Sequence, residues 1–298
     1  MSYVDRAYYD LLQKVLKEGE PRSDRTGVGT RSLFGEHIEV PLDPFPIVQW
    51  KKTFFRGVVE ELLWFLHGST NVGELQDKGV HIWDGNASQA YLRTRGLDTL
   101  PKNELGPIYG WQWRSWGKPY DTSGKETTTT PGIDQVKIVL DQLRHEPHSR
   151  RILIQAWNVS DLDQMALPPC HVMSQFYVRR PSGTSIPRLD CHVYQRSCDI
   201  GLGLPFNLAS YALLTHLLAH MTGYTVGKLR ISFGDVHIYE THVETLQNLP
   251  SPTYRGESEM PRLEITCPPR GDPSEYTYED FRWSRYEPGP SVNLPMAV

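Results

Sequence analysis

Apolar side chains recur at a helical spacing near the start of the chain. Residues 2–18 place them at intervals of three and four, with Ser2 suited to cap the first turn and Gly19 to end the last. Residues 54–67 are apolar on nearly all sides, which predicts a buried helix. Further helices are expected over 69–79, 134–147 and 207–224, the last being the longest and the most apolar.

Strand-like segments lie between these helices, and they are predicted over 33–42, 150–157, 171–180, 190–197 and 229–239. The polar stretch 117–133 is the best candidate for a mobile surface loop, and 181–189 is long for a hairpin. Residues 250–298 are rich in proline and are expected to wrap the surface with short strands. Because no repeat or linker separates two cores, we expect one α+β domain over 1–298, with a mixed β-sheet packed against a central buried helix.

Composition excludes several classes of protein. The 298 residues hold 31 Lys and Arg against 35 Asp and Glu, a net charge of −4, which argues against a dedicated nucleic-acid-binding protein. No apolar run approaches the about 18 residues of a membrane span, and the charged opening MSYVDRAYYD is not a secretory signal. The four cysteines form neither a disulfide framework nor a zinc-binding spacing. We therefore expect a cytoplasmic protein without a membrane segment or a metal.

Cys170 is the first candidate for chemistry. It follows Pro168 and Pro169, which exclude helix and lead an extended backbone into the next strand. A lone cysteine is most often a small apolar side chain that fills a gap. The alternative, a nucleophile, needs a nearby cation to lower the pKa of the thiol, and Arg196 and the pair Arg150–Arg151 are the candidates.

Arg150 and Arg151 stand side by side at the start of a predicted strand, where they would point to opposite faces. They are either a solvated pair at the edge of the sheet or a phosphate site, for which the guanidinium group is well suited. Arg25 could join them from the turn DRTGVGT. That turn lacks the glycine spacing of a P-loop or of a dinucleotide-binding motif.

Other polar side chains stand in apolar surroundings. One of the adjacent Glu60 and Glu61 should face the interior, where a carboxylate needs a partner or a raised pKa, although both could border the apolar face instead. Asn207 opens the longest helix, where capping is its simplest role. His237 and Tyr239 share one face of a strand, which is either core or a polar cleft.

Together, six blocks of sequence resemble the thymidylate synthase family. They are EELLWFLHGSTN (60–71), GPIYGWQWR (106–114), LPPCH (167–171), YQRS (194–197), LGLPFNLASYALL (202–214) and GDVHIY (234–239). The match keeps the family's order from DRTGVGT (24–30) to the terminal MAV (296–298). It implies an α+β fold that forms a homodimer through the backs of its sheets, with active sites shared between subunits. It also implies the conversion of dUMP to dTMP, with 5,10-methylenetetrahydrofolate as co-substrate and dihydrofolate as product.

The resemblance also implies roles for residues by motif position. Cys170 would add to carbon 6 of uracil, and an aspartate in place of Asn207 would suit cytosine instead of uracil. The implied catalytic residues are Cys170, Glu61, Tyr109, Arg196, Asp199 and Asn207. The implied dUMP-binding residues are Arg25, Gln195, Ser197, Asn207, His237 and Tyr239, with Arg150 and Arg151 reaching the partner's site. The implied folate-binding residues are Lys51, Phe54, Trp83, Asn86, Asp199, Leu202, Gly203, Phe206 and Val298.

Two departures from the family pattern are expected near the folate. Trp50 stands where threonine is usual, and Cys198 stands where glycine or alanine is usual. Because of them, a dUMP 5-hydroxymethyltransferase remains an alternative function, in which water captures the methylene group and tetrahydrofolate is released. Trp83 and the terminal MAV favour hydride transfer and the synthase. A homologue that only binds nucleotide or RNA is disfavoured, because it would not need a nucleophile.

Overall fold

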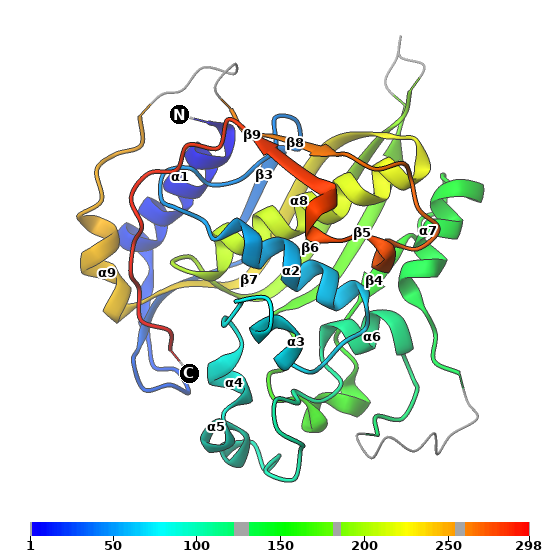
Figure 1. The fold of residues 1–298 in the computed structure, drawn as a ribbon. Coiled ribbons are helices and arrows are strands. Elements are labelled where there is room, and N and C mark those ends of the chain that lie inside the picture. The colour runs from blue at the N-terminus through cyan, green and yellow to red at the C-terminus, as the bar shows by residue number, and fades with distance from the viewer. Residues whose placement is uncertain (1, 122–130, 181–185, 254–259, 298) are drawn as a thin grey trace.

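A mixed β-sheet forms the centre of the computed structural model, which describes residues 2–121, 131–180, 186–253 and 260–297 (Figure 1). Its strand order is β1-β2-β7-β6-β5-β4, and β3 also pairs with β7. The β6–β7 pair is parallel and the others are antiparallel. The strands are β1 (Glu20–Arg22), β2 (Thr30–Phe34), β3 (His37–Pro41), β4 (Leu153–Gln155), β5 (His171–Arg179), β6 (Arg188–Asp199) and β7 (Thr225–Tyr239).

The helices are α1 (Tyr3–Glu18), α2 (Phe55–Leu66), α3 (Gly73–Gln76), α4 (Asp84–Ala87), α5 (Gln89–Thr94), α6 (Tyr109–Ser115), α7 (Gln135–His145), α8 (Gly203–Thr222) and α9 (Glu240–Gln247), with short 3-10 turns at Val159–Gln164, Pro273–Glu275 and Tyr278–Asp280. The helix α8 lies directly on this sheet, and α1 packs against β2, β3 and β7. A separate hairpin joins β8 (Arg262–Ile265) to β9 (Phe281–Ser284). This hairpin agrees with the short strands expected in the C-terminal segment.

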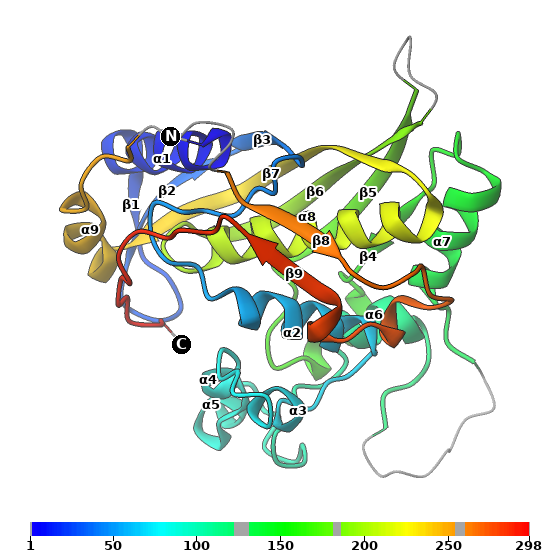
Figure 2. The same cartoon turned by 45° about the horizontal axis from the view of Figure 1, so that its top comes forward.

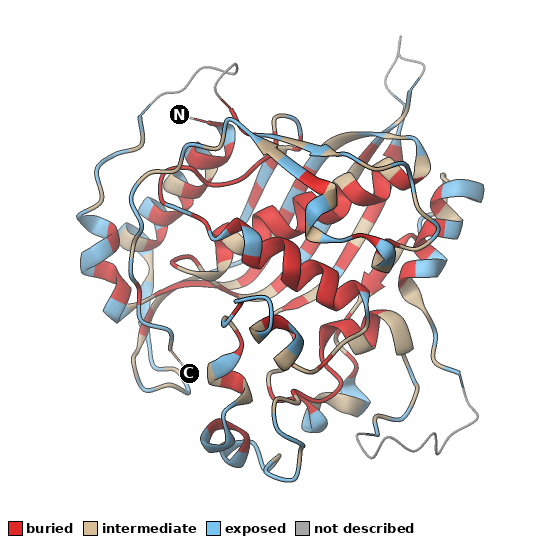
Figure 3. Ribbon diagram, in the orientation of Figure 1, coloured by how far each residue is buried: buried red, intermediate tan, exposed pale blue. Residues whose placement is uncertain are grey.

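The helix α8 is the central buried helix. It lies across β6 and β7, and α2 packs on its outer side, so that α8 is enclosed by protein (Figure 2). Figure 3 shows both helices as almost wholly buried. Their sequences explain this, because a helix that is apolar on all sides has no face suited to water. The mixed sheet against a central buried helix is as predicted.

The opposite face of the sheet is more exposed. Met173, Tyr177 and Tyr194 on β5 and β6 keep between 36% and 62% of their surface open to solvent. Large apolar side chains clustered on one face are typical of a surface that binds another protein.

Several predicted boundaries are wrong. The helix predicted from residue 207 begins at Gly203, because Pro205 stands in the first turn, where backbone N–H groups have no partner inside the helix. The segment 33–42 contains two strands, which separate at Gly35 with its φ of 84°. The strand predicted over 150–157 is only Leu153–Gln155, and the helix predicted over 69–79 is only Gly73–Gln76.

Other differences concern loops and the helices α4, α5, α6 and α9, which were not predicted. The helix α9 has many polar positions and gave no clear pattern in the sequence. Parts of the predicted loops, 122–130 and 181–185, lie outside the described residues. In the described ranges, no helix is both long enough and apolar enough to cross a bilayer.

Candidate active site

A cavity of about 700 Å³ opens where α2, α8 and the ends of β6 and β7 meet. Most of the residues singled out in the sequence line it. They are Arg25, Lys51, Phe54, Glu61, Trp83, Asn86, Tyr109, Cys170, Gln195, Arg196, Ser197, Asp199, Leu202, Gly203, Phe206, Asn207, His237 and Tyr239. Side chains from distant parts of the chain therefore meet at one site, as their implied roles require.

Cys170 lies directly before β5 and directly after the two prolines. Its backbone N–H donates to the Tyr109 hydroxyl over 2.7 Å. The Arg196 guanidinium donates to the carbonyls of Pro168 and Pro169, and its Nη2 lies 3.9 Å from the Cys170 sulfur. The two prolines thus hold both the thiol and its cation, because their carbonyls fix the arginine.

The electrostatics of this thiol reflect two opposing causes. Burial raises the pKa of Cys170 above its ordinary value, and Arg196 and then Tyr109 and Arg25 oppose that rise. The expectation of a lowered pKa for Cys170 is therefore wrong. The arginine lowers the pKa as expected, but desolvation has the larger effect.

Glu61 points into the cavity from the middle of α2. Its carboxylate accepts a hydrogen bond from Trp83 Nε1 at 2.7 Å, and burial raises its pKa to about 7 although this hydrogen bond opposes the rise. A carboxyl group with that pKa exchanges its proton near neutral pH, which suits general acid–base chemistry.

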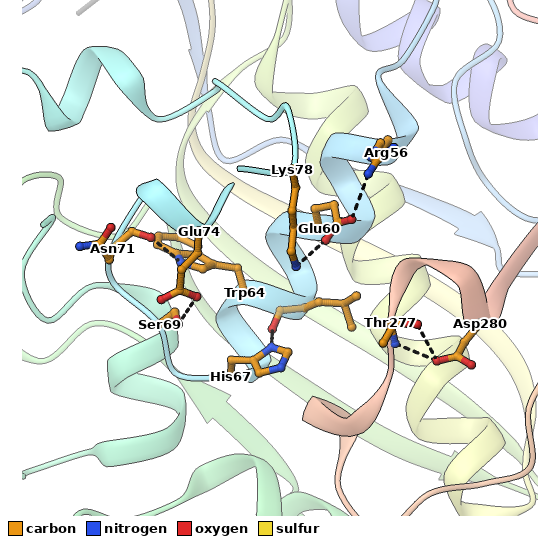
Figure 4. Close-up of polar contacts among 11 residues, drawn as sticks. Arg56, Glu60, Trp64, His67, Ser69, Asn71, Glu74, Lys78, Thr277 and Asp280 are labelled. Carbon is orange, nitrogen blue, oxygen red and sulfur yellow. Dashed lines mark hydrogen bonds and ion pairs between the residues drawn. The ribbon is translucent and has the colours of Figure 1, made fainter. Parts of the chain in front are cut away.

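Glu60, the neighbouring residue, does not line the cavity, and Figure 4 shows its side chain directed at Lys78 and Arg56. Its carboxylate lies 2.8 Å from Lys78 Nζ and 4.0 Å from Arg56 Nη2, and the residue is 4% exposed. Both glutamates are therefore buried, rather than one of the two. Glu60 pairs with Lys78 and Glu61 accepts a hydrogen bond from Trp83, so two contacts join the segment after α3 to α2.

We expect Lys78→Met to lower the free energy of unfolding by about 1 kcal/mol, because Glu60 loses its nearest cation and stays buried. Urea unfolding measures this change. The matched control is Lys102→Met, since Lys102 is an exposed lysine in the loop after α5. Equal stability of the two variants would contradict a role for the Glu60–Lys78 ion pair.

Asn207 lies inside α8 rather than at its cap. Leu202 holds the N-cap position, so capping is not the role of Asn207. Gln195 Nε2 donates to Asn207 Oδ1 over 2.8 Å, and both side chains are buried at the cavity wall. The pair fixes the orientation of the Asn207 amide. A rigid amide of this kind can recognise a ligand with adjacent donor and acceptor groups.

His237 and Tyr239 face the cavity on β7. His237 Nδ1 lies 2.7 Å from Asp235 Oδ1, and Asp235 accepts a second hydrogen bond from Ser32. The rings of His237 and Tyr239 are 5.2 Å apart. This face of β7 was expected to be either core or a polar cleft. Where it meets the cavity, it is a polar cleft.

Arg150 and Arg151 do not line this cavity. They are exposed and come before β4, so the prediction that they point to opposite faces of a strand is wrong. Arg150 instead borders a second hollow of about 370 Å³ near the exposed face of the sheet. Val298 lies outside the described residues, although Met296 and Ala297 line the main cavity.

The two departures from the family pattern lie behind the cavity wall. Trp50 donates to the Pro250 carbonyl over 2.6 Å and packs against Tyr8 and Tyr9 of α1. Cys198 is 1% exposed. Neither side chain lines the cavity, so neither alters its surface.

His171 is a cavity residue that the sequence reasoning missed. It is buried beside the Tyr109 ring, at a centroid distance of 5.1 Å, and burial lowers its pKa to about 4. It therefore stays neutral near pH 7. Its place next to Cys170 in LPPCH was the available signal. Among the described residues, no group of His, Cys, Asp and Glu is arranged to hold a metal ion.

Comparison with known proteins gives consistent matches. A family model described as thymidylate synthase matches residues 6–298. The chain is 44% identical over 294 residues to the thymidylate synthase of Agaricus bisporus, covering 98% of each chain. It is 46% identical over 292 residues to that of human herpesvirus 8, covering 98% of this chain and 83% of the relative.

A longer relative is also similar. The bifunctional dihydrofolate reductase-thymidylate synthase of Paramecium tetraurelia is 47% identical over 309 residues, with all of this chain covered. The chain spans only 63% of that relative's length.

Proposed function

The chain belongs to the thymidylate synthase family, and we propose that it converts dUMP to dTMP, with 5,10-methylenetetrahydrofolate as one-carbon donor and reductant. The observation that carries this proposal is the convergence of Cys170, Arg196, Asn207 and Glu61 on one cavity. These side chains supply a nucleophile, a cation, a base-recognising amide and a proton-exchanging carboxyl group. We further propose that residues 1–298 act as one catalytic domain and that the enzyme is cytoplasmic.

The nucleotide is bound along one side of the cavity. Arg196, Arg25 and Ser197 bind the phosphate, while His237 and Tyr239 bind the deoxyribose hydroxyl. Asn207 donates from its amide nitrogen to oxygen 4 of uracil and accepts from N3–H with its oxygen. Its contact with Gln195 supports this role, because the amide is held in place before the base arrives.

Cys170 begins the chemistry by adding its thiolate to carbon 6 of uracil. Carbon 5 then becomes an enolate carbon that attacks the methylene group carried by the folate. Glu61, with Asn86 and Tyr109, orders the water through which the proton at carbon 5 leaves and oxygen 4 is protonated. The folate supplies the one-carbon unit and then a hydride to the exocyclic methylene, the Cys170–carbon 6 bond breaks, and dTMP and dihydrofolate leave.

The other side of the cavity fits a folate. Trp83, Leu202 and Phe206 offer apolar surface for a flat ring system. Lys51 is 5% exposed, and burial lowers its pKa to about 8. A buried ammonium group of this kind suits the glutamate carboxylates of a folate. Phe54, Asn86, Asp199 and Gly203 complete the proposed folate-binding set, together with Val298.

Hydride transfer is favoured over capture of the methylene group by water. The hydroxymethyltransferase was an alternative because of Trp50 and Cys198. The side chains of these two residues lie outside the lining of the cavity, so they do not support that alternative. The terminal segment, with Met296 and Ala297, borders the cavity and helps to exclude water.

We also propose a homodimer that forms through the exposed face of the sheet. Met173, Tyr177 and Tyr194 supply apolar surface there, and Arg150 lies near the same face. In such a dimer, Arg150 and Arg151 reach the phosphate in the partner's cavity. This accounts for two exposed arginines that line no active site in their own chain.

Shared sites predict complementation between inactive chains. When Cys170→Ala and Arg151→Ala chains are mixed and refolded, half of the dimers are mixed, and each mixed dimer has one intact site. We therefore expect about one quarter of the wild-type activity. The control mixes Cys170→Ala with the double variant Cys170→Ala, Arg151→Ala, which has no intact site. Equal activity in both mixtures would contradict the proposal that active sites are shared between subunits.

Product analysis tests the proposed reaction. The purified protein is incubated with dUMP and 5,10-methylenetetrahydrofolate, the nucleotide is identified by mass and the folate by absorbance. We expect a methyl gain together with dihydrofolate. A hydroxymethyl gain with tetrahydrofolate would instead identify the hydroxymethyltransferase, and bound dUMP without product would identify a binding protein.

A further inference from the structure

His242 on α9 is a fully buried histidine outside the cavity wall, with contacts to two separate parts of the chain. Its side chain is 0% exposed. Nε2 lies 2.7 Å from the carbonyl oxygen of Pro295, and Nδ1 lies 3.6 Å from Asp199 Oδ1. None of the steps above uses this residue. It stands between the end of β6 and the C-terminal tail, here defined as residues 285–297.

The two partners of His242 determine where its protons lie. A carbonyl oxygen only accepts hydrogen bonds, so Nε2 must carry a proton. Nδ1 then has either a proton, which makes the ring a cation facing Asp199, or a bare lone pair facing a carboxylate. Burial alone lowers the pKa of His242, but Asp199 and the Pro295 carbonyl together raise it above its ordinary value. The site therefore stabilises the charged ring relative to that of an ordinary histidine.

Each partner of His242 is also connected to the cavity. Asp199 accepts hydrogen bonds from the backbone N–H groups of Gly201 and Leu202, which lead into the first turn of α8. Gly201 leaves room for the histidine, because a Cβ there would lie 2.6 Å from Nδ1. On the other side, the tail contributes Ser291, Val292, Met296 and Ala297 to the lining.

We propose that His242 is a positioning residue that joins the C-terminal tail to Asp199, so that the tail is held over the folate side of the cavity while the imidazole is protonated. The effect on folate rests on the proposed function. The connection between the tail and Asp199 does not, because it rests only on contacts of His242 with the protein itself.

The charges around His242 determine the sign of its pH dependence. Asp199 at the end of β6 favours the cation, and Lys51 in the segment before α2 disfavours it. Tyr239 at the end of β7 packs against the imidazole, at a centroid distance of 5.6 Å. Because the folded pKa is raised, the connection is complete at mildly acidic pH and is lost as the pH rises through that raised value.

Two substitutions separate the two contacts. In His242→Gln, the amide reaches the position of Nε2, so the donor to Pro295 is kept and the charge facing Asp199 is lost. In His242→Asn, the amide reaches only the position of Nδ1. A donor to Asp199 is therefore kept, and the hydrogen bond to the Pro295 carbonyl is lost. His145→Gln, at the exposed end of α7, is the matched control.

The first readout is the release of terminal residues by a carboxypeptidase, without any ligand. We expect both His242 variants to release them about tenfold faster than the wild type and the control at mildly acidic pH. At alkaline pH the difference should shrink for His242→Gln, because the wild type has also lost the charge facing Asp199. It should persist for His242→Asn, because the neutral imidazole still donates from Nε2 to Pro295. Release at the wild-type rate from both variants would overturn the proposal. This result does not depend on whether the protein makes dTMP.

The second readout tests the effect on the co-substrate. In variants whose thermal unfolding matches the wild type, KM for 5,10-methylenetetrahydrofolate should rise about tenfold while dUMP binding stays unchanged. A purely structural defect would weaken both. If neither variant folds, NMR titration of His242 in the wild-type protein decides: a pKa above the ordinary histidine value supports the proposal, and one below it overturns the proposal.

Discussion

Cys170→Ser is expected to lower the rate of dTMP formation by at least about a thousandfold while dUMP still binds within a few-fold of the wild-type affinity. The serine hydroxyl is a much weaker nucleophile than a thiolate at neutral pH. The residues proposed to bind dUMP, among them Arg196 and Asn207, are unchanged in this variant. Steady-state kinetics measure the first effect, and equilibrium titration with dUMP measures the second.

The control for this variant is Cys267→Ser. Cys267 is also a partly exposed free thiol, but it follows β8 and lies outside the cavity. It should keep full activity. Near-normal activity of Cys170→Ser, or an equal loss in both variants, would be incompatible with Cys170 as the nucleophile.

Glu61→Gln is expected to lower kcat by about 10²- to 10⁴-fold, the range typical of a lost general acid–base group. The pKa of Glu61 is about 7 because burial disfavours the carboxylate. In the wild type, the base form is therefore lost as the pH falls through about 7. We expect the kcat–pH profile to have an acidic limb near that value, and the limb to be absent in the variant because an amide does not titrate.

Glu60→Gln is the matched control for this substitution. It changes the neighbouring residue of the same helix, which is equally buried but faces Lys78 instead of the cavity. We expect it to lower stability and to keep the acidic limb of the profile. A limb that persists in Glu61→Gln would assign the titration to another group, and the proposed role of Glu61 would be wrong.

These two glutamates illustrate the limit of sequence reasoning. Residues 60 and 61 lie in one apolar helix, and the pattern indicated that a carboxylate there should face the interior. Which residue faces the cavity depends on how α2 is rotated against α8 and on where Trp83 and Lys78 come to lie. Helix packing determines that rotation, and it involves residues far apart in the chain.

For Cys170, too, the sequence predicted the local backbone and the tertiary structure decided the rest. Its place before a strand followed from Pro168 and Pro169, which restrict the backbone locally. The direction of its pKa did not follow, because the pKa depends on the balance between burial and the approach of Arg196. That balance is a property of the assembled cavity.

The sequence by itself determined the helices α1, α2 and α8, the main strands and the candidate residues for chemistry. These depend on local patterns: apolar periodicity, caps, prolines and short motifs. Only the tertiary structure decided the start of α8, the distance of Arg150 and Arg151 from the cavity in their own chain, and the contacts of His242 with Asp199 and Pro295. Each of these depends on contacts between segments that are distant in sequence, and such contacts have no local signal because they form only when the chain packs.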